Sequence, residues 1–204
     1  MNATETLAPA RLDPDMNGMP MTPEEFDAVE DWNEDYRYEL VRGVLIVVPP
    51  PSAGERTPND ELGYLFRVYR DSHPQGSSLD DTTFEQTIRT STGRRIADRV
   101  VWAGLGRKPN YRKDIPTIAI EFVARRKRDW KRDHLEKRDE YAEAGVSEYW
   151  VIDRFRRRMT VYRGLGEELV IAEGDVYRTD LLLGFELPLA RILAIADRCA
   201  DAES

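Results

Sequence analysis

The sequence predicts a mixed α/β domain in which helices flank a central β-sheet. Residues 115–123 and 147–153 are rich in β-branched and aromatic residues, as strands are, and a helical pattern lies between them at residues 129–144. A strand, a helix and a strand in this order form a right-handed crossover that joins two parallel strands. A hairpin at residues 37–48 adds antiparallel strands, so we expect the whole sheet to be mixed.

Residues 1–20 predict a flexible tail, because proline, glycine and small polar residues are frequent there. Order is expected to begin with a short helix at Thr22, whose hydroxyl can cap the first turn. Pro23 suits the first helical position, and Glu25 completes a capping box.

The hairpin is predicted by two apolar runs, residues 38–41 and 44–48, on either side of Arg42-Gly43, a pair suited to a tight turn. A helix over residues 59–71 is predicted next. Its apolar positions recur at helical spacing and make one face, which consists of Leu62, Leu65, Phe66 and Tyr69.

The remaining elements complete a single domain over residues 21–197, followed by a short C-terminal tail at residues 198–204. The helix at residues 129–144 is expected to end at Gly145, a residue that suits a helix C-cap. An apolar segment and a last helical pattern, residues 189–195, finish the domain. Strands are expected near residues 84–90, 96–102, 115–123, 147–153 and 158–162.

The composition narrows the class of protein. The chain has 204 residues, a net charge of −8 and one cysteine, Cys199, which excludes an internal disulfide framework and a cysteine zinc cluster. This cysteine usage suits the reducing cytoplasm. No apolar run approaches the length of a membrane span, and the N-terminus lacks the pattern of a secretory signal. We therefore expect a cytoplasmic protein without membrane association.

Two acidic residues stand within predicted apolar strands, Asp98 and Glu121. A carboxylate in such a strand costs several kcal/mol unless a cation compensates it. A divalent cation between two such carboxylates would remove their repulsion, and oxygen ligands suit magnesium. The alternative is that each acid points to solvent or pairs with a nearby arginine, from the set Arg95, Arg99, Arg125 and Arg126.

Basic residues follow Glu121 closely and predict contacts with nucleic-acid phosphates. A second basic group occupies residues 154–158. The alternative for such runs is a solvated loop and helix face. The candidate nucleic-acid-binding residues are Arg125, Arg126, Arg128, Lys131 and Arg132.

Five segments together carry a family resemblance: Tyr38–Leu45, Ala97-Asp98, Ile120–Val123, Glu136–Tyr141 and Glu148–Asp153. They resemble the Uma-type restriction-endonuclease family of the PD-(D/E)XK nuclease superfamily. The resemblance implies a restriction-endonuclease-like fold, a mixed sheet flanked by helices, and magnesium-dependent cleavage of phosphodiester bonds in DNA.

The resemblance also implies roles for individual residues. Asp98, Glu121 and the backbone carbonyl of Phe122 would hold Mg²⁺ or Mn²⁺. Glu39 resembles an additional acid of the family that binds the metal or orients the nucleophile, and we expect it to converge with Asp98 and Glu121 at one edge of the sheet. The alternative for Glu39 is a hairpin carboxylate paired with Arg37 or Arg42. A homodimer is expected by analogy, because two symmetry-related sites can cut both strands of a duplex.

The chain departs from the superfamily at Val123, where the usual strand lysine is absent. We expect Lys137, on the helix after Glu121, to supply the missing cation and to complete the candidate catalytic set with Glu39, Asp98 and Glu121. Two alternatives are a surface pair between Lys137 and Asp133, or use of Arg125 or Lys131 instead.

The same departure leaves two other classes of function open. The first is a catalytically impaired nuclease fold that acts as a nucleic-acid-binding or regulatory module. The second is an interaction protein in which the acids form only salt bridges.

Overall fold

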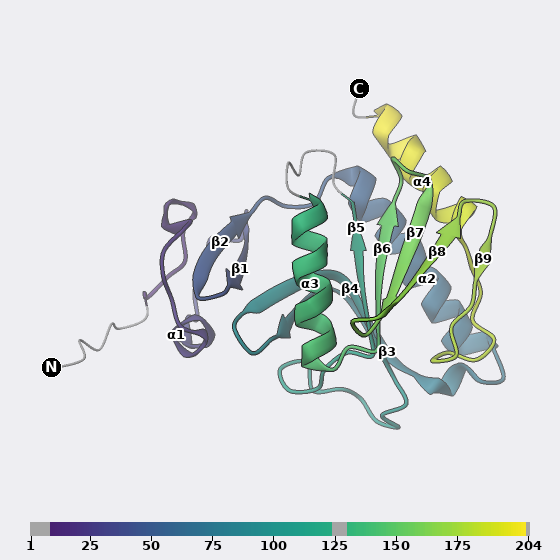
Figure 1. The fold of residues 1–204 in the computed structure, drawn as a ribbon, viewed down its shortest axis with the longest axis horizontal. Coiled ribbons are helices and arrows are strands. Elements are labelled where there is room, and N and C mark those ends of the chain that lie inside the picture. Colours follow the sequence, from purple (N-terminus) through teal and green to yellow (C-terminus); the bar gives the residue numbers. More distant parts are fainter. Residues whose placement is uncertain (1–8, 124–129, 203–204) are drawn as a thin grey trace, which may run out of the picture. The chain divides into compact units, whose positions relative to one another are not determined.

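The computed structural model describes residues 9–123 and 130–202, with the backbone alone at residues 130–133 and 200–202. The chain divides into two compact units, and the single domain over residues 21–197 stays a prediction. The smaller unit comprises residues 1–50 and 89–96, and the larger unit comprises residues 51–88 and 97–204. Figure 1 labels the helices and strands.

The smaller unit begins its regular structure with the predicted capping box. Helix α1 spans Pro23–Ala28. The Thr22 hydroxyl accepts a hydrogen bond from the backbone N–H of Glu25 at 3.1 Å, and the Glu25 carboxylate accepts one from the N–H of Thr22 at 2.7 Å. The predicted helix start is therefore confirmed.

The predicted hairpin is also present in the smaller unit. Strands β1 (Arg37–Val41) and β2 (Val44–Val48) are antiparallel. Arg42 and Gly43 both have positive φ, 49° and 77°. Two such residues in succession make the tight turn whose twist matches that of the flanking strands.

Residues 9–20 are the described part of the expected flexible tail, and they have defined structure. Residues 14–16 form a short 3-10 helix, and the N–H of Gly18 donates to the carbonyl of Leu45 at 2.8 Å. Leu12 is buried in one apolar cluster with residues of the hairpin. The few apolar side chains that cover the hairpin stand among prolines and polar residues, so the sequence pattern did not predict their burial.

The larger unit is built on a mixed sheet, as predicted. Strands β5 and β6 are parallel, whereas β4–β5, β6–β7 and β7–β8 are antiparallel; β3 also pairs with β4. A separate two-stranded sheet consists of β9 and β10. The strand bounds are β3 Leu79–Arg89, β4 Arg94–Ala103, β5 Ile118–Phe122, β6 Glu148–Asp153, β7 Arg158–Arg163, β8 Glu167–Ala172, β9 Val176–Tyr177 and β10 Leu187–Pro188.

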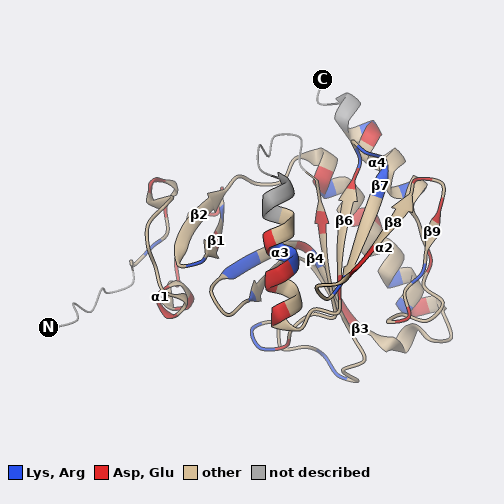
Figure 2. Ribbon diagram, viewed as in Figure 1, with Lys and Arg blue, Asp and Glu red and all other residues tan. Residues whose placement is uncertain are grey.

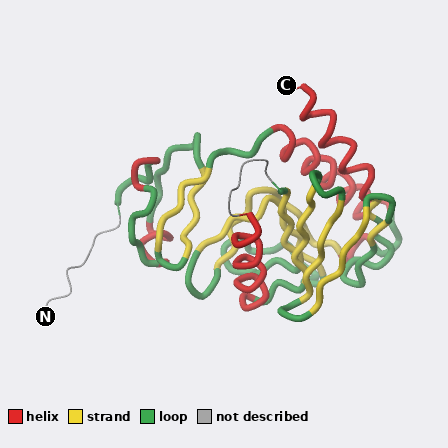
Figure 3. The backbone as a smooth tube through the Cα atoms, turned by 45° about the horizontal axis from the view of Figure 1, so that its top comes forward, coloured by secondary structure: helices red, strands yellow, loops and turns green. Residues whose placement is uncertain are grey.

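Helices cover both faces of this sheet (Figures 1 and 3). Helices α2 (Ala53–Ser72) and α4 (Leu189–Ala202) pack on one face, and α3 (Trp130–Ala144) packs on the other. Helix α3 ends at Gly145, with φ 99°, as predicted. Helix α2 begins six residues earlier than predicted, at a capping box of Ser52 and Glu55. Helix α4 continues to Ala202, so residues 198–202 extend the helix where a tail was expected.

Each face of the sheet has its own apolar cluster. On the side of α2 and α4, the ring centroids of Phe66 lie 4.7 Å from Phe185 and 6.1 Å from Trp150. On the side of α3, Trp102, Tyr141 and Tyr149 belong to the second cluster. The crossover helix α3 is therefore held firmly against β5 and β6.

One carboxylate in the resemblance motif, Glu148, is structural. It is buried in β6 and accepts hydrogen bonds from Trp150 Nε1 at 2.8 Å, Arg163 Nε at 2.9 Å and the Tyr177 hydroxyl at 3.0 Å. Burial raises the pKa of Tyr177 above its ordinary value, so this hydroxyl stays protonated and donates.

We expect Glu148→Ala to lower the free energy of unfolding by about 3 kcal/mol, because it leaves buried donors without their acceptor. Glu167→Ala is the matched control, since it removes an exposed carboxylate from the same Arg163, 3.0 Å away. That exposed pair contributes less than about 1 kcal/mol. Urea denaturation measures both variants, and equal losses would contradict a structural role for Glu148.

Candidate active site

The two strand acids of the candidate site lie on neighbouring strands of the larger unit. Arg99 of β4 pairs with Ile120 of β5, so Asp98 and Glu121 are the next residues along the two antiparallel strands. Only 8% of Asp98 and 4% of Glu121 is exposed. Asp98 Oδ2 accepts a hydrogen bond from the backbone N–H of Phe122 at 2.8 Å. The side chain of Asp98 thus ties β4 to β5 beside Glu121.

Lys137 lies against Glu121. Its Nζ atom is 2.7 Å from Glu121 Oε1, and only 2% of the residue is exposed. This contact arises because α3 connects β5 to β6 and packs on the face that carries Glu121. Figure 2 shows both acidic and basic positions on α3, yet Lys137 is turned inward. The side chain of Asp133, the alternative partner, lies outside the described side chains.

Glu39 belongs to the smaller unit, where its carboxylate has defined contacts. Glu39 Oε2 lies 3.3 Å from Arg95 Nη1, and Oε1 accepts from the N–H of Ile96 at 2.9 Å. The structure thus gives Glu39 the partner Arg95, whereas the sequence offered Arg37 or Arg42. The convergence of Glu39 with Asp98 and Glu121 stays a prediction.

Arg99, one of the alternative partners of the acids, makes contacts with α2. Its Nε donates to Asn59 Oδ1 at 2.6 Å, and Asn59 Nδ2 donates in turn to the carbonyl of Asp98 at 2.8 Å. Burial lowers the pKa of Arg99 to about 10. Gly63 makes this position possible, since a Cβ there would lie 2.5 Å from Arg99 Nη2. Successive strand residues point to opposite faces, so Arg99 supports β4 from the side of α2.

The structure describes little of the predicted nucleic-acid-binding residues. Arg125, Arg126 and Arg128 lie outside the described residues, and Lys131 and Arg132 lie in α3 with their side chains outside them. The second basic group is partly used in ion pairs: Arg156 bonds Asp153 at 2.8 Å, and Arg157 bonds Asp197 at 2.7 Å. Its role is therefore at least partly structural.

Two more residues of α3 face inward, and sequence reasoning did not include His134 in the site. His134 is buried, and its Nδ1 lies 2.9 Å from the Tyr149 hydroxyl. Tyr141 is fully buried, and its hydroxyl lies 3.5 Å from Glu121 Oε1. The signal was the helical spacing, because residues 134, 137 and 141 share one face of a helix.

The chemistry of the donor set fits a small divalent cation. Within residues 9–123 and the described side chains beyond them, no three His, Cys, Asp or Glu residues gather as a metal cluster. Magnesium needs no such cluster, since one or two carboxylates usually hold it together with waters and substrate phosphates. Asp98, Glu121 and the Phe122 carbonyl would provide two carboxylates and one neutral oxygen.

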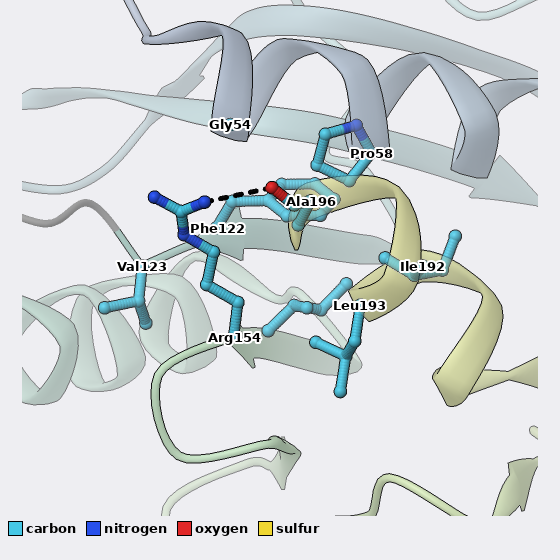
Figure 4. Close-up of a pocket in the computed structure, with 9 residues that line it drawn as sticks. Gly54, Pro58, Phe122, Val123, Arg154, Ile192, Leu193 and Ala196 are labelled. Carbon is cyan, nitrogen blue, oxygen red and sulfur yellow. Dashed lines mark hydrogen bonds between the residues drawn. The ribbon is translucent and has the colours of Figure 1, made fainter. Parts of the chain in front are cut away.

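A small pocket of the larger unit is lined in part by Phe122, the residue whose carbonyl belongs to the candidate site (Figure 4). Its cavity volume is about 10 Å³, which is room for about one water molecule. Arg154 Nη1 donates to the carbonyl of Ala196 at 3.0 Å across it. The pocket is too small for a substrate. Its lining residues are Gly54, Pro58, Phe122, Val123, Ile152, Arg154, Ile192, Leu193 and Ala196.

A mixed sheet between helices, with an acid on each of two neighbouring strands and a lysine beside them, defines the class of restriction-endonuclease-like folds. The profile of the Uma2 family, described as "Putative restriction endonuclease", matches residues 23–190. The chain therefore belongs to the Uma2 family. This membership supports a nuclease function.

A solved structure has the same fold. It is described as a "putative nuclease belonging to DUF820" from Anabaena variabilis, and the TM-score is 0.68 at 15% sequence identity. The similarity covers 87% of this chain and 99% of that chain. The search among curated proteins found no match. Across the described helices, none has the length and apolar character needed to cross a membrane.

Proposed function

We propose that this protein is a metal-dependent endonuclease that hydrolyses phosphodiester bonds of DNA. The observation that carries the proposal is the grouping of Asp98 and Glu121 on paired strands with Lys137 Nζ, 2.7 Å from Glu121 Oε1. The two carboxylates and the lysine are buried together where the sheet meets α3, and burial of charged groups costs free energy that partners or a function must offset. The three groups match what hydrolysis of a phosphodiester needs: cation ligands and a fixed positive charge.

Each residue has a distinct role in this proposal. Asp98, Glu121 and the Phe122 carbonyl hold Mg²⁺ or Mn²⁺, which when bound neutralises phosphate charge and makes a water more acidic. Lys137 orients the attacking water and stabilises the negative charge that develops on the phosphate. Glu39 is the additional acid of the proposed site, which binds the metal or orients the attacking water. A homodimer would place two such sites on the two strands of a duplex.

Supercoiled plasmid DNA tests the function directly. With Mg²⁺ or Mn²⁺ the protein should convert the plasmid to nicked and linear forms, and EDTA should stop the reaction. Binding of DNA without cleavage in either metal would instead favour a nuclease-fold protein that acts as a nucleic-acid-binding module. The observation behind this second function is Val123, which stands where the strand lysine of the superfamily would be.

The basic run after β5 is proposed to guide phosphates to the site. Replacing Arg125, Arg126 and Arg128 by alanine should weaken DNA binding. It should also lower the slope of log affinity against log salt by up to about three, because fewer counterions are released. Fluorescence anisotropy at several salt concentrations measures both quantities.

The matched control changes the net charge equally but elsewhere. Lys108, Arg112 and Lys113 are exposed in the loop between β4 and β5, at the end of β5 remote from Glu121. Their alanine variant should keep most of the affinity and slope. Equal losses in the two triple variants would mean that only net charge matters, and the local guidance would be rejected.

A further inference from the structure

Helix α3 carries hydrogen-bonding side chains on the face that it buries. A helix packed on a sheet normally buries an apolar stripe, whereas His134, Lys137 and Tyr141 are all buried here. Burial of polar groups costs free energy unless they find partners. Each of the three has a partner on the sheet: Tyr149 for His134, and Glu121 for both Lys137 and Tyr141.

Lys137 and Tyr141 meet the same oxygen atom of Glu121. Lys137 Nζ lies 2.7 Å and the Tyr141 hydroxyl 3.5 Å from Oε1. The second contact is long for a hydrogen bond between oxygens. Hydrogen bonds of active sites are often long in the absence of ligands and tighten in the complex. Two donors on one oxygen restrict rotation of the carboxylate more than a single donor does.

The ring of Tyr141 is held in place by its neighbours. It packs edge-on against Tyr149, with ring centroids 5.2 Å apart and planes at 85°. Tyr149 stacks on Tyr162 at 5.9 Å and bonds His134 through its hydroxyl at 2.9 Å. This aromatic row ties two turns of α3 to β6 and β7. The Tyr141 hydroxyl is consequently presented to Glu121 from a rigid support.

We propose that Tyr141 is a positioning residue for Glu121. Its hydroxyl, together with Lys137, holds Oε1 so that the carboxylate meets a divalent cation in a single orientation. The inference rests on the proposed function, in which Glu121 is a cation ligand. Helix α3 then has two functions: it supplies the positive charge of Lys137, and it orients the Glu121 carboxylate through Tyr141.

Binding of Mn²⁺ to the full-length protein without DNA tests this role, since it does not depend on cleavage. Electron paramagnetic resonance should show that Tyr141→Phe binds Mn²⁺ about fivefold more weakly than the parent, the effect of losing one hydrogen bond of ordinary strength, as suits a contact of 3.5 Å. Tyr162→Phe is the matched control, because Tyr162 belongs to the same aromatic row and is joined to it through Tyr149. This control should bind Mn²⁺ as the parent does.

Glu121→Gln separates the failure of this inference from the failure of the proposed function. If Glu121→Gln loses Mn²⁺ while Tyr141→Phe binds it as the parent does, Tyr141 has no positioning role and the proposed site stands. If Glu121→Gln itself binds Mn²⁺ normally, both fail. Should Tyr141→Phe not fold, 3-fluorotyrosine at position 141 keeps the ring and hydroxyl but changes the donor strength. An unchanged Mn²⁺ affinity in that variant would overturn the inference.

Discussion

Asp98→Asn is expected to abolish binding of Mn²⁺ and to lower the rate of plasmid cleavage by at least about a thousandfold, the larger end of what one electrostatic group contributes. Asparagine keeps the size of aspartate and one acceptor oxygen. It can therefore still accept the N–H of Phe122, which now bonds Asp98 Oδ2 at 2.8 Å. The fold should survive while the charge at the paired position beside Glu121 is lost.

The measurement combines paramagnetic resonance of Mn²⁺ with a cleavage assay on the same preparations. Asp81→Asn is the matched control, because it removes an aspartate from β3, another strand that pairs with β4. Asp81 accepts a hydrogen bond from the Tyr111 hydroxyl, so its change tests the loss of a structural carboxylate. If Asp98→Asn bound Mn²⁺ as tightly as Asp81→Asn, the shared cation site would be refuted.

Local signals in the sequence were sufficient for much of the fold. Thr22 with Glu25, the Arg42-Gly43 turn and Gly145 each act within one or two turns of chain, and all three are found where predicted. The inward position of Lys137 followed from similar reasoning. A crossover helix must pack on the sheet that it connects, so a residue near its middle can reach the strand that precedes it.

Contacts between distant segments could not be predicted in this way. The pairing of Glu39 with Arg95 depends on how the hairpin meets the start of β4, and no local pattern encodes that register. Burial of Arg99 depends on the absence of a side chain at Gly63, one turn of α2 after Asn59. The burial of Leu12 could not be predicted, because the residues that it packs against lie on the hairpin, far away in the sequence. Such residues take their roles from tertiary packing rather than from propensity.

Lys137→Met is expected to lower cleavage at saturating Mn²⁺ by about a hundredfold to a thousandfold, because the transition state loses a preorganised positive charge. Methionine keeps most of the side-chain volume that α3 buries. In the metal-free protein the variant leaves the Glu121 carboxylate without the cation 2.7 Å from it, so its melting temperature should fall. A divalent cation restores a positive charge there, so Mn²⁺ should raise the melting temperature of the variant more than that of the parent.

The melting temperature and the cleavage rate separate the roles of this lysine. Mn²⁺ should restore the stability of Lys137→Met but not its cleavage rate. Arg138→Met is the matched control: it removes the next positive charge on α3, which pairs with Asp139 at 2.7 Å and lies over the ring of Tyr162. This control should cut DNA at nearly the parent rate. If Lys137→Met cuts at the parent rate once Mn²⁺ is saturating, the lysine serves only as the counterion of Glu121 in the metal-free protein. The positive charge for catalysis would then have to come from elsewhere, and the basic run at residues 125–132 would be the first place to search.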